Sequence, residues 1–411
     1  MQKYYTFFLR DTLPKSEAHI GQVVQSANAA ANLGFRVLLL YLKKGWDAAR
    51  PLDWIAPFQP VKPDRILASF YNIQDRLEVL PLSMPWPVDR ISSKYTSSST
   101  LVCKYYLPVH LRHRTQIVQS RDWNFIKAAV HNGIPAIYEY HHIERKKFEP
   151  EIVNHPLFQA AVTVADSVLE NLIESGIPPK KAMKLHNGFG QLFLARHPHQ
   201  AREWRQKLLS GDRTHLVVYA GSLYKFKGID LLIEAAKDLP HVQFALAGGP
   251  DSQIQAYRQT IEQQQIDNVT LVGCLPQSQL AELLQAADAL VNPHLSGEAA
   301  NFTSPLKLFD YMAAGKPIVA SKIPPLKEFE SSPLIAGWCE PDDPIAFSRC
   351  LQGVLDRYPN WNEASIHPPD LIEEFSWERR ISKILDRVDA SLRPIGDVRK
   401  NHVRTVGVKG S

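Results

Sequence analysis

The stretch Thr303-Ser-Pro-Leu-Lys-Leu-Phe-Asp-Tyr-Met-Ala-Ala-Gly-Lys-Pro-Ile-Val-Ala-Ser321 joins a predicted helix to a predicted strand. Ser304 is a favoured helix N-cap and Pro305 suits the first helical position, which predicts a helix over residues 305–314. The Gly-Lys-Pro break then ends the helix, and the apolar run at residues 318–320 is typical of a buried strand. A helix that leads directly into a buried strand favours an α/β fold.

The start of this helix also predicts a ligand site. Unpaired backbone N–H groups at a helix N-terminus bind anions. Asp310 follows nearly two turns later, where its carboxylate can accept hydrogen bonds from sugar-type hydroxyls. A phosphate-binding N-terminus and a carboxylate that accepts hydrogen bonds from hydroxyl groups, both on one helix, indicate a nucleotide-sugar site. The alternative, from this stretch alone, is an ordinary capped helix with a solvated Asp310.

Length and composition set the broad class of the chain. It has 411 residues, more than one hydrophobic core usually covers, so two domains are expected. Its 45% hydrophobic and 22% charged residues are typical of a globular protein. No apolar run approaches the roughly 20 residues of a membrane span. Residues 1–10 predict a β-strand rather than a signal peptide, so we expect a cytoplasmic protein.

Cysteine spacing and charge exclude several functions. The four cysteines form no C-x-x-C pair, which argues against a zinc ribbon or a disulfide framework and favours reduced core residues. Net charge is +7 over residues 1–195, −6 over 196–390 and +4 over 391–411. The basic segments favour an anionic membrane surface or acidic acceptor, or they are ordinary surface charge. Nucleic-acid binding is not expected, because no aromatic-basic or helix-turn-helix motif accompanies the charge.

Strand-length apolar runs alternate with helical patterns through both halves, which predicts two doubly wound domains with parallel sheets. We expect residues 1–195 to form the first domain, 196–375 the second, 376–393 a closing helix and 394–411 a disordered basic tail. Ligands of such sheets bind outside the carboxyl ends of strands, so the active site is expected at the domain junction. The predicted strands are residues 4–9, 36–41, 66–69, 117–119, 136–140, 161–164, 216–220, 243–247, 270–272, 289–292, 318–320 and 334–336.

Several segments, taken in order, resemble one known family. They are Ser120-Arg-Asp122, Tyr138-Glu-Tyr-His-His142, His186-Asn-Gly188, Tyr219-Ala-Gly-Ser-Leu-Tyr-Lys-Phe-Lys-Gly-Ile-Asp230 and Gly248-Gly249-Pro250. Together with the opening stretch, they resemble the family 4 glycosyltransferases. The resemblance covers about residues 4 to 390, is strongest from 214 to 328, and implies the GT-B arrangement of two Rossmann-like domains.

The resemblance also implies roles for individual residues. The implied catalytic residues are His141 and Lys227. The implied donor-binding residues are Gly221, Ser222, Lys225, Lys227, Gly249, Gly273, Cys274, Leu275, Glu298, Thr303, Ser304, Leu306 and Asp310. The implied acceptor-side residues are Glu17, His19, Gly21, Arg121, Asp122 and Glu139.

Two positions depart from the family pattern. Ser222 stands where the family usually has an arginine for the donor phosphates, and Lys225 is expected to replace that cation in part. The family also has two glutamates separated by seven residues, and here Phe302 and Asp310 hold those positions. Glu298 either reaches the donor sugar from a longer loop or is a solvated loop residue.

The family resemblance implies a retaining sugar transfer in which the donor phosphate takes the acceptor proton. No Asp-x-Asp motif is present, so no metal is expected, and the only co-substrate is a UDP- or GDP-sugar. The acceptor is a glycan, a lipid or a small molecule. One alternative is an inactive protein that binds sugar nucleotides. Another is a GT-B epimerase or phosphorylase, although a phosphorylase needs a pyridoxal-binding lysine motif that the sequence lacks.

Overall fold

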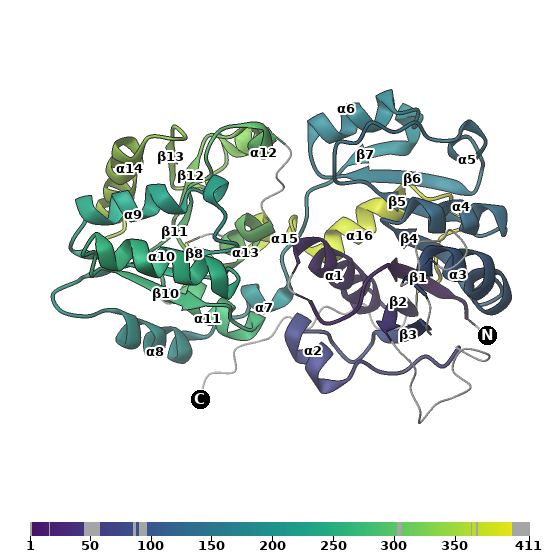
Figure 1. Cartoon of the computed structure of the whole chain (residues 1–411), viewed down its shortest axis with the longest axis horizontal. Coiled ribbons are helices and arrows are strands. Elements are labelled where there is room, and N and C mark those ends of the chain that lie inside the picture. The colour runs from purple at the N-terminus through teal and green to yellow at the C-terminus, as the bar shows by residue number, and fades with distance from the viewer. Residues whose placement is uncertain are drawn as a thin grey trace.

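The computed structural model describes residues 2–15, 17–44, 58–84, 88–89, 97–301, 306–362, 364–366 and 369–396. It contains two parallel sheets, each in its own lobe of the molecule (Figure 1). The first sheet has the order β3-β2-β1-β4-β5-β6-β7 and the second the order β10-β9-β8-β11-β12-β13. In each sheet the order reverses beside the first strand along the chain. Such a reversal point is where α/β sheets bind their ligands.

The strands of the first sheet are β1 (Tyr4–Leu9), β2 (Val37–Lys44), β3 (Glu78–Met84), β4 (Thr115–Ser120), β5 (Ala136–Glu139), β6 (Phe158–Thr163) and β7 (Ala182–Lys184). Those of the second are β8 (His215–Ala220), β9 (Val242–Ala247), β10 (Val269–Gly273), β11 (Ala289–Asn292), β12 (Ile318–Ser321) and β13 (Gly337–Cys339). Five of them, β1, β5, β9, β11 and β12, are buried along their whole length, as strands covered on both faces are.

The helices of the first half are α1 (Ala18–Asn32), α2 (Arg65–Tyr71), α3 (Ser98–Leu101), the π-helix η1 (Val102–Leu111), α4 (Trp123–His131), α5 (Pro150–Val153), α6 (Asp166–Glu174) and the 3-10 helix η2 (Pro179–Lys181). Those of the second half are α7 (Gln191–Leu194), α8 (Pro198–Leu208), the 3-10 helix η3 (Lys225–Lys227), α9 (Ile229–Asp238), α10 (Asp251–Gln263), α11 (Gln277–Ala286), α12 (Glu298–Asn301), α13 (Leu306–Ala314), the 3-10 helix η4 (Pro324–Phe329), α14 (Pro344–Arg357), α15 (Pro369–Glu373) and α16 (Trp377–Asp386).

Helix α16 returns to the first domain after the chain has completed the second. Its buried side chains Trp377, Ile381 and Ile384 join the core formed by α1 and one face of the first sheet. In Figure 1 it lies beside α1, away from the second sheet. Ser376, just before it, pairs with Phe189 in an isolated parallel bridge. The two segments that connect the domains therefore run side by side.

The domain limits differ in detail from the expected ones. Phe189 and Phe193 already pack in the core of the second domain, so that core begins a few residues before position 196. At the other end, Gly396 forms an isolated antiparallel bridge with Phe35, so the start of the expected tail lies against the first domain. Residues 397–411 of that tail lie outside the described residues.

Two strand predictions were wrong. Residues 66–69 belong to helix α2, because Asp64 caps it by accepting a hydrogen bond from Leu67 N at 2.7 Å and Asn72 ends it with φ 51°. The third strand along the chain is β3, which the sequence did not predict and which contains Pro81, a residue that is unfavourable within strands. The predicted strand at 334–336 lies just before β13. The other predicted strands overlap observed ones.

Two further expectations concern the cysteines and the membrane. All four cysteines are free, as expected, but Cys274 is exposed rather than in the core. Among the described helices, none is both long and apolar enough to cross a bilayer.

We predict that Ile381→Ala destabilises the protein by roughly 2–5 kcal/mol, because it empties a fully buried site between α16 and the first-domain core. Urea unfolding measures the change. Arg387→Ala, at the exposed end of the same helix, serves as control and should cost less than about 0.5 kcal/mol. An equally small loss for Ile381→Ala would show that α16 is not part of that core.

Candidate functional site

The turn after β8 allows a close approach of backbone segments. Gly221 N donates to Ala247 O at 2.9 Å, and the carbonyl of Gly221 faces the turn after β9. A Cβ at Gly248, where φ is +121°, would lie 2.1 Å from Gly221 O. Only glycine fits there, because the conformation and the space both exclude a side chain. The ends of β8 and β9 thus form one compact loop surface.

A lysine and a histidine meet beside this surface. Lys227 ends the 3-10 helix η3, and its Nζ lies 3.1 Å from Nε2 of His294, which follows strand β11. The next residue, Gly228, has φ +77° and lies so close to Pro293 that an added Cβ would be 1.8 Å from its carbonyl oxygen. This contact fixes Lys227 next to His294 at the reversal point of the second sheet.

A second lysine enters the same site from α13. Lys307 lies in the first turn of this helix, and its Nζ is 3.8 Å from the centre of the Tyr219 ring. A Cβ placed on Gly221 would be 3.5 Å from the same Nζ, so the amine lies against the turn after β8. The hydroxyl of Tyr311 holds α13 in place, because Ala220 N donates to it at 2.7 Å. We call Lys227, Lys307 and His294 the cationic cluster.

The cationic cluster is electrostatically uncompensated. Burial lowers the pKa of Lys227 to about 8. Burial, and then the charge of Lys227, hold the pKa of Lys307 well below its ordinary value. Burial and the two lysines lower the pKa of His294 to about 2. Within the described ranges no carboxylate pairs with Lys227 or Lys307, and Lys307 Nζ has no hydrogen-bond partner.

Buried cations of this kind are costly unless an anion compensates them. The cluster also lies where α/β sheets bind ligands. An anion placed here would receive charge-assisted hydrogen bonds from both lysines. The arrangement therefore fits a di-anionic group such as a diphosphate.

The structure places the other predicted donor residues around the cluster or apart from it. Gly221 borders it and Ser222 follows in the same turn, whereas the side chain of Lys225 is exposed. Gly273 ends strand β10, and Cys274 and Leu275 follow it; the Cys274 thiol donates to the carbonyl oxygen of Gly249 at 2.9 Å. Glu298 is exposed at the start of α12. Thr303 and Ser304 lie outside the described residues.

Asp310 and Leu306 lie at the junction of the two domains. The carboxyl group of Asp310 is buried and accepts a hydrogen bond from the backbone of Gly190, in the segment that connects the domains. Burial raises the pKa of this carboxyl well above its ordinary value. Leu306 is half-buried and packs against the first-domain core.

In the first domain, His141 belongs to a buried ionic network. Its Nε2 lies 2.8 Å from Oε2 of Glu139, at the end of β5. Arg380 of α16 donates to both oxygens of Glu139, at 2.8 and 2.9 Å. Burial opposes ionisation of Glu139, but Arg380 and His141 outweigh it and hold the pKa of the carboxyl well below its usual range. Burial lowers the pKa of His141 to about 4, although Glu139 acts in the opposite direction.

The remaining acceptor-side residues are scattered around the ends of β1 and β4. Arg121 Nη2 lies 3.0 Å from His142 Nε2. The carboxylate of Asp122 caps helix α4 by accepting from Phe125 N at 3.0 Å. The other three lie at the start of α1, where Glu17 and His19 are exposed and Gly21 has open space around its Cα.

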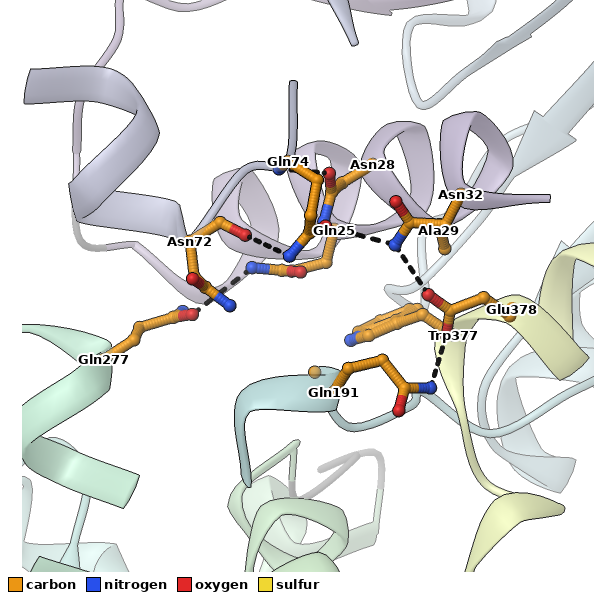
Figure 2. Close-up of a pocket in the computed structure, with 11 residues that line it drawn as sticks. Gln25, Asn28, Ala29, Asn32, Asn72, Gln74, Gln191, Gln277, Trp377 and Glu378 are labelled. Carbon is orange, nitrogen blue, oxygen red and sulfur yellow. Dashed lines mark hydrogen bonds between the residues drawn. The ribbon is translucent and has the colours of Figure 1, made fainter. Parts of the chain in front are cut away.

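A small pocket between the domains is lined mainly by amides (Figure 2). Gln25 of α1 donates to Gln277 of the second domain at 3.4 Å. Glu378, at the start of α16, accepts from Asn32 at 2.9 Å and from Gln191 at 3.2 Å. The domains therefore meet here through amide and carboxylate hydrogen bonds, a polar interface typical of domains that move relative to each other.

Sequence reasoning missed three residues of these two clusters: Lys307, His294 and Arg380. Lys307 lies within the stretch 303–321 that predicted the donor site. From the sequence alone, however, a lysine in the first turn of a helix is expected to be exposed to solvent. His294 carried a signal, since it is polar and follows a predicted parallel strand. Arg380 carried one as well, because it lies on the apolar stripe of α16. The described residues contain no group of three or more His, Cys, Asp or Glu side chains arranged to hold a metal.

Similarity to solved structures defines the class of fold. HepE of Anabaena, solved with UDP-glucose, matches 94% of this chain and 100% of its own at a TM-score of 0.65 and 16% identity. The catalytic domain of starch synthase IV from Arabidopsis thaliana, bound to ADP and acarbose, matches 94% of this chain and 99% of its own at a TM-score of 0.62 and 14% identity. The chain has the GT-B fold, as expected.

Similarity in sequence is concentrated in the second domain. Residues 214–357 match the family described as Glycosyl transferases group 1. D-inositol 3-phosphate glycosyltransferase of Mycolicibacterium smegmatis is 26% identical over 194 residues, 46% of this chain and 42% of the relative. Alpha-galactosylglucosyldiacylglycerol synthase of Streptococcus pneumoniae is 30% identical over 163 residues, 36% and 43% respectively. The chain spans about half the length of the curated relatives it matches.

We predict opposite effects of Lys307→Met on the free and the ligated protein. The free protein should melt at a higher temperature, because the change removes a buried, unpaired amine. Inorganic pyrophosphate should bind roughly tenfold or more weakly, because a charge-assisted contact is lost. A thermal-shift titration measures both. Lys225→Met, at an exposed position of η3, should keep the pyrophosphate response; an undiminished response in Lys307→Met would contradict the assignment.

Proposed function

We propose that the protein is a glycosyltransferase that moves a sugar from a nucleotide-sugar donor to an acceptor hydroxyl. The observation that carries the proposal is the cationic cluster, where two partly buried lysines have no carboxylate partner among the described residues, at the reversal point of the second sheet. The fold and the family match of residues 214–357 support it. We assign the donor diphosphate to Lys227 and Lys307, with the turn at Gly221 and Ser222 beside them.

The proposed mechanism centres on the departing diphosphate. The bond between the anomeric carbon and the β-phosphate oxygen breaks, and its electron pair stays on the diphosphate. Cations aimed at that developing charge are the strongest catalytic contribution available. The acceptor oxygen forms the new bond from the same face of the sugar, and its proton passes to the leaving phosphate oxygen, so configuration is retained. Two lysines offset the diphosphate charge in this scheme, which therefore operates without a metal ion.

The other roles expected from the sequence form part of the proposal. We assign Asp310 to the ribose hydroxyls, the end of β10 to the nucleobase, and His141 to the reacting sugar. For the ribose contact, the Asp310 carboxyl would have to exchange its backbone partner Gly190 for the donor. A small movement of the domains, which meet through an amide-lined pocket, would allow this exchange.

A UDP-sugar is the first donor to test, because HepE was solved with UDP-glucose. The relatives include enzymes named for inositol phosphate, lipopolysaccharide and diacylglycerol substrates, so we propose a glycan, lipid or small-molecule acceptor. A cytoplasmic location at the inner face of an anionic membrane is also proposed, given the +7 charge of residues 1–195. Flotation with anionic liposomes at low salt tests the membrane contact, and lack of binding would exclude it.

We predict that a UDP-, GDP- or ADP-sugar releases its nucleoside diphosphate in the presence of this protein, by slow hydrolysis when no acceptor is added. Lys227→Met should lower the rate roughly 100-fold or more, since it removes a contact to the leaving group. A coupled assay for the nucleoside diphosphate measures the release, with Lys225→Met as the matched control. Tight binding of a nucleotide-sugar without release, also when acceptors are supplied, would favour the alternative of an inactive sugar-nucleotide-binding protein.

A further inference from the structure

We propose that Arg380, in the last helix of the chain, is a positioning residue that keeps the ring of His141 uncharged and in a single tautomer by engaging the Glu139 carboxylate between them. The proposal deepens the proposed function, because it gives His141 a defined state in the reacting site. It rests on geometry that links residues 241 positions apart in the sequence. Nothing in the local sequence around His141 requires such a partner.

All three nitrogen atoms of the Arg380 guanidinium donate hydrogen bonds. The guanidinium donates to both carboxylate oxygens of Glu139, at 2.8 and 2.9 Å, and its Nε donates to His186 O at 3.0 Å. The two side chains are 3% and 2% exposed. A fork of this kind holds a carboxylate in one orientation, and burial keeps water from competing for it. Gln119 Nε2 adds a third donor to Glu139 Oε1 at 2.6 Å.

The orientation of Glu139 decides the tautomer of His141. An ionised carboxylate only accepts hydrogen bonds, so Nε2 of His141, 2.8 Å from Glu139 Oε2, must carry a proton. In the uncharged ring, Nδ1 then has a free lone pair. That nitrogen can accept a hydrogen bond from a substrate hydroxyl, which a protonated imidazole cannot do.

The charges around His141 decide whether the ring takes up a second proton. Glu139 on β5 is the only carboxylate in contact with it among the described residues, and Arg380 on α16 already balances that charge. Arg121, after β4, adds a further positive charge that opposes protonation. Tyr5 on β1 touches the network only through Gln119, as a neutral hydroxyl.

One more titratable group, His142, lies nearby but does not reverse this balance. His142 contacts Arg121 at 3.0 Å, and the pKa of His142 is lowered by burial and then by Arg121. Without Arg380, the Glu139 carboxylate would be left unpaired in a buried site. It would then recruit a proton to His141, and an imidazolium-carboxylate pair would replace the hydrogen bond from the uncharged ring.

The first test is spectroscopic and does not need turnover. Ring ¹⁵N shifts of the full chain, with His141 assigned by comparison with His141→Gln, should show a neutral Nε2–H tautomer in the wild type from pH 8 down to about pH 5.5. In Arg380→Met the ring should titrate at or above the ordinary histidine value of about 6.5. Arg380→Lys should restore the neutral ring, because it returns the cation.

Two further variants separate charge from folding. Arg379→Met, an exposed neighbour on the same helix, should leave the wild-type titration unchanged. The double variant Glu139→Gln/Arg380→Met removes both charges and should keep His141 neutral, because no carboxylate remains to recruit a proton. Titration of His141 near 6.5 in the wild type would overturn the proposal even if Arg380→Met fails to fold. Equal titration in the wild type and Arg380→Met would overturn it as well.

The second test follows donor turnover between pH 8 and pH 6. In Arg380→Met the rate at pH 6 should fall to roughly a quarter of its pH 8 value, the fraction of neutral imidazole for a pKa of about 6.5. The double variant should keep the ratio of the wild type. A merely structural role would lower the rate at every pH and leave the ratio unchanged. If no donor turns over, the proposed function fails, whereas the spectra still decide the role of Arg380.

Discussion

The active region depends on one electrostatic constraint: two lysine amines share a buried site without a carboxylate between them among the described residues. Two amines stay in such a site only if their surroundings are rigid, because the lysines would otherwise turn towards water. Tyr311 supplies part of that rigidity by fixing α13 to the backbone of Ala220. The contact of Gly228 with Pro293 supplies another part by fixing the end of η3. Burial lowers the pKa of both amines, and a bound anion would favour their charged forms again.

The last helix joins the two halves of the molecule. Helix α16 follows the second domain in sequence but completes the core of the first. It also brings Arg380 to Glu139 and so reaches His141 from the far end of the chain. Amide side chains and the single carboxylate of Glu378 line the nearby pocket between the domains. Packing holds the helix in the first domain, and the proposed movement of the domains around a substrate would take place at this pocket.

Hydrophobic pattern alone was enough to predict the architecture, because buried parallel strands such as β1, β8 and β9 read as continuous apolar runs. It failed at residues 66–69, where a short apolar run fits either a strand or a helix and the caps at Asp64 and Asn72 decide. The family pattern predicted Lys227. It did not predict Lys307 or Arg380, because a charged residue on a helix looks solvated until the tertiary structure shows what surrounds it.

The most direct test of the account is the number of protons taken up when a nucleoside diphosphate binds at pH 8. Isothermal calorimetry of UDP in two buffers of different ionisation enthalpy measures it. Burial lowers the pKa of Lys227 to about 8 and holds that of Lys307 well below its ordinary value, so both amines should gain protons as the diphosphate approaches. The account predicts uptake of more than about half a proton. Tight binding of UDP with no uptake would contradict it, because the diphosphate would then lie away from the two lysines.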